Sequence, residues 1–185
     1  MEIPILSLML LVSLVGAVVT FFLGKNPKMA KISALVFSAI PMVLSLLMLT
    51  EYVQTGGGYQ FKESFTWIES LGISYILGVD GISVPMVFLS TLLVFLAVIF
   101  SWDVDHRTNQ FMALLLVLEL GVLGVFMALD YVLFYVFWEV VLIPMYFLIG
   151  VWGGPRRAYA AIKFFIYTHI ASLVMLLGIF ALYFD

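Results

Sequence analysis

Long apolar segments separated by short polar connections dominate this sequence. A helix of about 20 apolar residues is long enough to cross the roughly 30 Å hydrocarbon core of a bilayer. The pattern predicts such helices at about residues 3–23, 32–52, 82–102, 111–129, 131–152 and 159–184. We therefore expect an all-α polytopic membrane protein, with a single membrane domain over residues 1–185.

One longer connection, residues 53–79, separates the second and third predicted helices. Its segments FKESFTWI and ISYIL alternate apolar and polar residues around a break at Ser70 to Gly72, which is typical of a β-hairpin. A lone hairpin is only marginally stable, so we expect this one to lie on other extramembrane protein. Asp80, which follows the hairpin, is well placed to cap the third helix.

The composition supports the membrane class and removes several kinds of chemistry. Hydrophobic residues make up 65% of the chain and charged residues 10%, with no cysteine and two histidines. Thiol chemistry and iron–sulfur ligation are thereby excluded. The sequence also lacks a P-loop, a GxGxxG motif and a basic nucleic-acid stripe. We expect no cofactor or metal site on this chain, no redox chemistry of its own and no nucleic-acid partner.

Basic residues indicate the orientation, because cytoplasmic connections are enriched in lysine and arginine. One set of alternate connections carries most of them, and the 53–79 connection carries only Lys62. We therefore place the N-terminus and residues 53–79 on the non-cytoplasmic side. The first helix lacks a basic leading region and a cleavage pattern, so we expect it to be retained, in a prokaryotic plasma membrane. The cytoplasmic set is Lys25, Lys28, Lys31, Arg107, Arg156 and Arg157.

Two glutamates lie within apolar segments and are the first candidates for function. Glu119 lies about 16 Å before the turn at Asp130, and Glu139 lies about 14 Å after it. In an antiparallel helical hairpin both carboxyl groups would lie near the middle of the membrane. An ionised carboxylate there costs at least ~2.5 kcal/mol, so such a residue is a functional candidate by default. The alternative is a protonated glutamate that joins neighbouring helices.

The sixth segment adds Lys163 and His169, at depths of about 6 Å and about 15 Å from the cytoplasmic end. Lys163 could favour ionisation of nearby carboxylates and admit protons, or simply anchor the helix by extending to the surface. His169 lies at a depth similar to that of Glu139, so the two could form a proton relay. The alternative for His169 is a satisfied interhelical contact. Hydroxyls of Tyr167, Thr168 and Ser172 could contribute hydrogen bonds.

Three blocks of sequence resemble the antiporter-like subunit M of respiratory complex I, the proton-translocating NADH:quinone oxidoreductase. They are LGVDGISVPMV at 77–87, LGVFMALDYVLFYVFWEVVLIPMYFLIGVWGG at 123–154 and AAIKFFIYT at 160–168. The first block is shared among the antiporter-like subunits, whereas the other two favour subunit M. The resemblance covers nearly the whole chain.

The resemblance implies that Glu139 belongs to the proton-translocation machinery and that Glu119 is a secondary participant. It also implies other membrane subunits of a large respiratory complex as partners, in addition to the lipid bilayer. The family has later helices, which carry the lysine partner of Glu139, so we expect this chain to be the N-terminal six-helix portion of a longer subunit, or of one that is naturally split or truncated. His169 has no counterpart that the resemblance supplies.

Three functions remain open from the sequence. The first is a membrane subunit that couples redox energy from other subunits to proton transfer through Glu139 and Glu119, with Lys163 and His169 in the relay. The second is a subunit of a cation/proton antiporter, in which the same glutamate works without a redox partner. The third is a membrane scaffold without a transport role.

Overall fold

The computed structural model describes residues 4–23, 26–55, 58–69 and 72–184. Six helices and a two-stranded antiparallel hairpin between the second and third helices confirm the predicted fold class. All six helices are long and apolar enough to cross a membrane. Ile3, Lys25, Gly56, Gly57, Ser70 and Leu71, on which parts of the predictions fall, lie outside the described residues. The elements are α1 (Ile5–Phe22), α2 (Pro27–Thr55), β1 (Gln60–Ile68), β2 (Ile73–Val79), α3 (Ser83–Phe100), α4 (Thr108–Met127), α5 (Tyr131–Trp152) and α6 (Arg157–Phe184).

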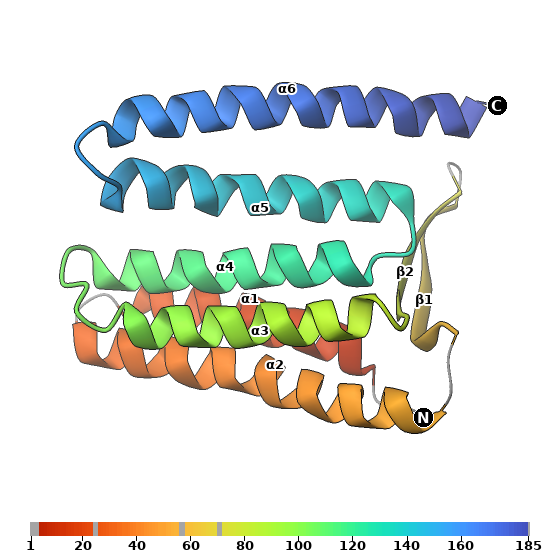
Figure 1. Ribbon diagram of the computed structural model, residues 1–185, viewed down its shortest axis with the longest axis horizontal. Helices are drawn as coiled ribbons and strands as arrows, with labels where there is room; N and C mark the ends of the chain where they lie inside the picture. Colours follow the sequence, from red (N-terminus) through yellow and green to blue (C-terminus); the bar gives the residue numbers. More distant parts are fainter. Residues whose placement is uncertain (1–3, 24–25, 56–57, 70–71, 185) are drawn as a thin grey trace.

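The helices run side by side, with the hairpin at one end of the bundle (Figure 1). Helices α1 to α4 form a cluster, α5 packs on α4, and α6 packs on α5 at the edge. The end of α1, the start of α2, and the α3–α4 and α5–α6 connections lie at the end opposite the hairpin (Figure 1). The predicted basic connections therefore share one end of the bundle, as a membrane orientation by charge requires.

The second helix begins at Pro27, five residues before the start that the apolar pattern predicts. Proline suits the first turn of a helix because it has no N–H to leave unpaired. The apolar pattern did not predict the start of this helix, because its first residues include polar side chains. Lys31 is one of them, and its ammonium lies 3.2 Å from Asp105 Oδ1 in the α3–α4 connection.

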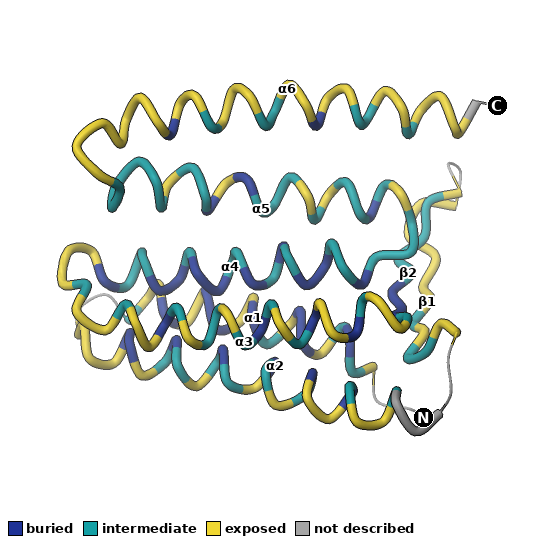
Figure 2. The backbone as a smooth tube through the Cα atoms, viewed as in Figure 1, coloured by how far each residue is buried: buried dark blue, intermediate teal, exposed yellow. Residues whose placement is uncertain are grey.

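Buried side chains concentrate in the α1–α4 cluster and decrease towards α6 (Figure 2). One core group joins α1, α2, α3 and α4 to the hairpin, and it includes Leu6, Met48, Leu77, Val87 and Met127. Along α6, by contrast, only Ala161 and Ser172 are buried among the described side chains. The outer face of α6 is therefore the face on which lipid or further protein can pack.

The hairpin is attached to the helix ends of this same chain. The Glu63 carboxylate of β1 accepts hydrogen bonds from Leu6 N at 2.8 Å, from Ser7 N at 3.1 Å and from the Ser7 hydroxyl. These amides belong to the first turn of α1, where free N–H groups and the helix dipole favour a negative charge. The Tyr75 hydroxyl of β2 lies 2.9 Å from the Ser7 hydroxyl. Burial, together with the charge of Glu63, raises the pKa of Tyr75 despite the Ser7 contact.

Two aspartates fix the starts of α3 and α5. Asp80 Oδ1 accepts hydrogen bonds from Ser83 N at 2.8 Å and from Ile82 N at 3.0 Å, so it caps α3 as predicted. The Ser83 amide, followed by the Ser83 hydroxyl, lowers the pKa of Asp80. This stabilisation is present above the ordinary aspartate pKa of about 3.9 and is lost as the pH falls through the lowered value.

Asp130 has a wider role than the sequence indicated. Its Oδ1 accepts hydrogen bonds from Val132 N at 2.9 Å and Leu133 N at 3.0 Å, which caps α5. Its Oδ2 accepts one from Ser74 N of β2 at 3.3 Å. Leu129 N also donates to Ile76 O at 2.9 Å. The start of α5 is thereby tied to the hairpin, and the hairpin is tied through Glu63 to α1.

Replacing Glu63 with glutamine is expected to loosen this attachment. The substitution removes the charge that faces the α1 dipole and replaces one acceptor oxygen with a donor, at a cost of about 1 kcal/mol. Hydrogen exchange at the amides of Leu6 and Ser7 should then accelerate by about fivefold. Glu69→Gln is the matched control, because Glu69 lies exposed on the same hairpin. Equal exchange rates in the two variants would contradict the capping role of Glu63.

Candidate polar site between α5 and α6

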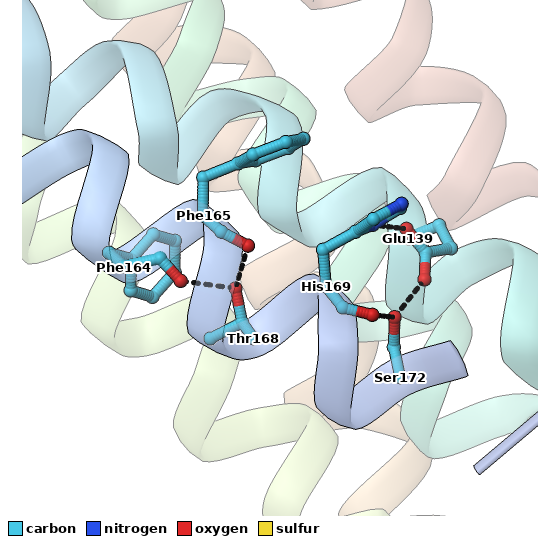
Figure 3. A network of polar contacts seen from close by, with 6 residues as sticks. All are labelled: Glu139, Phe164, Phe165, Thr168, His169 and Ser172. Atoms are coloured by element: carbon cyan, nitrogen blue, oxygen red, sulfur yellow. Dashed lines mark hydrogen bonds and ion pairs between the residues drawn. The ribbon is translucent and has the colours of Figure 1, made fainter. Parts of the chain in front are cut away.

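Glu139 of α5 meets two polar side chains of α6 where these two helices pack together (Figure 3). The Ser172 hydroxyl donates to Glu139 Oε1 at 2.5 Å, and His169 Nδ1 lies 3.3 Å from Glu139 Oε2. The His169 contact meets the distance of an ion pair without the geometry of a hydrogen bond. Tyr135, one turn before Glu139, neighbours both Glu139 and Ser172 through its hydroxyl. Each carboxylate oxygen thus has its own polar neighbour on α6.

An aromatic side chain fixes the orientation of the His169 ring. Phe165 stacks on the imidazole, with ring centroids 5.2 Å apart and planes 10° from parallel. Tyr146 of α5 packs edge-on against Phe165 at 5.5 Å. The Thr168 hydroxyl turns back to its own helix and donates to Phe164 O at 2.7 Å (Figure 3). Ser172, and not Thr168, is therefore the hydroxyl that α6 supplies to Glu139.

The site is shielded on one side and open on the other. The side chain of Glu139 is 26% exposed and that of His169 is 41% exposed. Both face the α5–α6 contact, which lies at the thin edge of the bundle (Figure 2).

Glu119 lies in a different environment, between α4 and α1. Its residue is 1% exposed, and its only polar contact among the described residues is with the Ser13 hydroxyl, 3.0 Å from Oε2. Glu119 Oε1 has no hydrogen-bond partner there. The Ser13 hydroxyl also lies 3.2 Å from Met9 O, so its single hydrogen is divided between two acceptors. A carboxylate so poorly solvated favours the neutral acid, which can itself donate to Ser13.

Two glycines bring α4 and α5 together and set the levels of the two acids. A Cβ atom on Gly121 would lie 2.7 Å from a Val141 methyl group, and one on Gly124 would overlap the Phe137 ring. Glu119 therefore lies at the level of Ile143 on α5, which is about one helical turn, or ~6 Å, from Glu139. The two acids lie at similar depth and face different neighbours, Glu119 towards α1 and Glu139 towards α6.

Lys163 does not join the Glu139 group. Its ammonium lies 5.8 Å from the centroid of the Tyr159 ring, and no contact among the described residues joins Lys163 to Glu139 or His169. Tyr167 points outward and is 78% exposed. The predicted relay role of Lys163 stays a prediction. Ser13, Phe165 and Tyr135 were not predicted as site residues, because the sequence does not show which helix faces meet.

The described residues contain no group of three histidine, cysteine, aspartate or glutamate side chains that could hold a metal ion. The side chains of the α5–α6 site can exchange protons and form hydrogen bonds. Carboxylate, imidazole and hydroxyl groups in contact are the components of a proton relay.

Part of this chain matches a known protein family. Residues 128–184, which contain the whole α5–α6 site, match the transmembrane family of NADH:quinone oxidoreductases and Mrp antiporters. Subunit M of the Methanosarcina mazei F(420)H(2) dehydrogenase is 43% identical over 98% of this chain and 37% of that protein. Subunit M of the Rhodobacter capsulatus NADH-quinone oxidoreductase is 46% identical over 83% of this chain and 30% of that protein.

The chain is a homologue of antiporter-like subunit M. In the structure of respiratory complex I from Thermus thermophilus, one chain is 26% identical to this protein. The two share a fold with a TM-score of 0.81, over 96% of this protein and 35% of the complex I chain. One chain of an archaeal membrane-bound sulfane sulfur reductase has the same fold, with a TM-score of 0.81 and 19% identity. The match covers 95% of this protein and 36% of that chain. The protein described here spans about a third of the length of these relatives.

Glu119→Gln is expected to preserve the stability of the protein described here. A glutamine amide has the shape of the neutral acid and can donate to Ser13, so the melting temperature in detergent should stay close to that of the wild type. Glu119→Ala should instead leave a cavity and cost about 2–4 kcal/mol. A glutamine variant as unstable as the alanine variant would show that Glu119 is held as an anion.

Proposed function

We propose that this chain is part of a proton-translocating membrane subunit of a complex I-type oxidoreductase, with Glu139 as the group that exchanges protons. The observation that carries the proposal is the contact of both Glu139 oxygens with His169 and Ser172 of α6. The family match over residues 128–184 supports it, because that segment contains all three side chains. The related M subunits belong to NADH-quinone oxidoreductases and an F(420)H(2) dehydrogenase.

The mechanism follows from what stabilises each form of the carboxyl group. Desolvation by the apolar bundle favours the neutral acid, whereas a nearby positive charge favours the carboxylate. Glu139 would therefore release its proton when a cation approaches it. When that cation withdraws, Glu139 would take up a proton again. His169 can be such a cation when protonated, and it can carry the proton onward. Ser172 holds one carboxylate oxygen in place during the exchange. The energy comes from redox chemistry on other subunits.

Glu139→Gln is expected to lower the number of protons translocated per electron pair in the assembled complex. Glutamine keeps the shape of the side chain and can still contact Ser172, but it cannot bind or release a proton at neutral pH. The measurement is proton uptake into vesicles alongside the rate of electron transfer. Glu69→Gln on the exposed hairpin is the control. An unchanged stoichiometry in the Glu139 variant would remove Glu139 from the proton route.

His169→Gln is expected to slow proton translocation by about tenfold, for the loss of an interaction worth ~1.4 kcal/mol at the carboxylate. Thr168→Val is the matched control, because the Thr168 hydroxyl bonds only the backbone of its own helix. Assembly, followed by the yield of intact complex, should be equal in the two variants. Equal translocation rates would leave His169 as a packing residue.

The antiporter and scaffold alternatives predict different results. An antiporter subunit would purify with other antiporter subunits and exchange cations without an electron donor. A complex I-type subunit would purify with iron–sulfur and quinone-reactive subunits after mild detergent extraction. In a scaffold, Glu139→Gln would lower the melting temperature while transport per assembled complex stayed intact.

A further inference from the structure

A basic groove lies where α5 turns into α6, apart from the Glu139 site. The groove has a volume of about 730 Å³ and is formed by the turn and the first three turns of α6. Its polar lining includes three cationic side chains, and two tyrosines stand beside them: Arg156, Arg157, Lys163, Tyr159 and Tyr167. The groove lies at the end of the membrane-spanning helices, where phospholipid headgroups lie in a bilayer.

Among the described residues, no acidic side chain forms an ion pair with these cations. None of the ion pairs among the described residues includes Arg156, Arg157 or Lys163. Arg157 uses one N–H to donate to Val151 O at 2.7 Å, and its other donors remain available. At the same end of the bundle Lys31 does have an acidic partner, Asp105. Lys31 is the only lysine or arginine in an ion pair among the described residues, so the α5–α6 turn keeps its positive charge.

An apolar groove of about 570 Å³ continues from the basic one along the outer face of α6. The two grooves share Tyr159, Lys163 and Tyr167, so they form one continuous surface. Its apolar part is formed by Ile162, Ile166, Ile170 and Ala171. From Lys163 to Ile170 this surface extends about 10 Å into the membrane. A charged entrance that leads to an apolar track along a helix matches a phospholipid, with its phosphate at the surface and an acyl chain beneath.

We propose that the α5–α6 turn binds the headgroup of an anionic phospholipid, with an acyl chain along the isoleucines of α6. Basic pockets on the cytoplasmic side of membrane helices bind anionic headgroups. Arginine is well suited to phosphate because its planar guanidinium presents several donors at once. Lys163 reaches the same level because its apolar stem lies along the helix while its ammonium stays near the surface. An apolar protein helix in this place would cover the isoleucines but leave three positive charges without partners.

The test compares two double variants of the full-length subunit, incorporated in lipid nanodiscs. Arg156→Gln with Lys163→Gln removes two charges from the groove. Lys28→Gln with Arg107→Gln removes the same charge from the same end of the bundle and leaves the groove intact. Binding of phosphatidylglycerol and of phosphatidylcholine with identical acyl chains is then measured by native mass spectrometry. The groove variant should bind phosphatidylglycerol about 30-fold more weakly, or ~1 kcal/mol for each charge, while the control variant retains wild-type binding.

A second measurement needs no substitution and therefore does not depend on how the variants fold. A photoactivatable phosphatidylglycerol in the intact complex should label the peptide that contains residues 157–171. Equal loss of phosphatidylglycerol in the two double variants would overturn the proposal, as would equal binding of the two lipids by the wild type. Absence of label from residues 157–171 would also overturn it, and would assign the face to a protein neighbour.

Discussion

The cost of holding a carboxylate within an apolar layer is the constraint on which this structure depends. An ionised acid in the middle of a membrane is disfavoured by at least ~2.5 kcal/mol, so each such acid must be neutral or have polar neighbours. Glu119 and Glu139, the two acids near the middle of the membrane, meet this constraint in different ways. Glu119 is enclosed between α4 and α1 and shares one hydroxyl, that of Ser13, and its predicted secondary part in proton transfer stays a prediction. Glu139 has imidazole and hydroxyl neighbours on the adjacent helix, which suits a group that changes its charge.

The geometry of the Glu139 site is set by contacts outside it. Asp130 caps α5 and binds the hairpin, which Glu63 in turn attaches to α1. Within the bundle, Gly121 and Gly124 allow α5 to lie close against α4. The position of α5 is thus fixed at its start and along one face, while its other face meets α6.

The sequence was sufficient for the number of helices and for the hairpin, because apolar length and two-residue alternation are properties of each segment by itself. The contacts of the acids were less accessible. Helices that are apolar on nearly all sides have no strong periodicity, so the faces of α5 and α6 that meet could not be read from the pattern. Depth alone paired Glu139 with His169. Ser13 and Glu63 were missed because their partners, Glu119 and the start of α1, are distant in the chain.

Infrared difference spectroscopy of the assembled complex during turnover would test most directly whether Glu139 changes protonation. A protonated carboxyl group has its own C=O stretching band, which shifts in heavy water and disappears on ionisation. We expect a turnover-dependent band that is absent when Glu139 is replaced and displaced when Ser172, its hydrogen-bond donor, is replaced. A complex that translocates protons while Glu139 keeps one protonation state throughout would contradict the proposed mechanism.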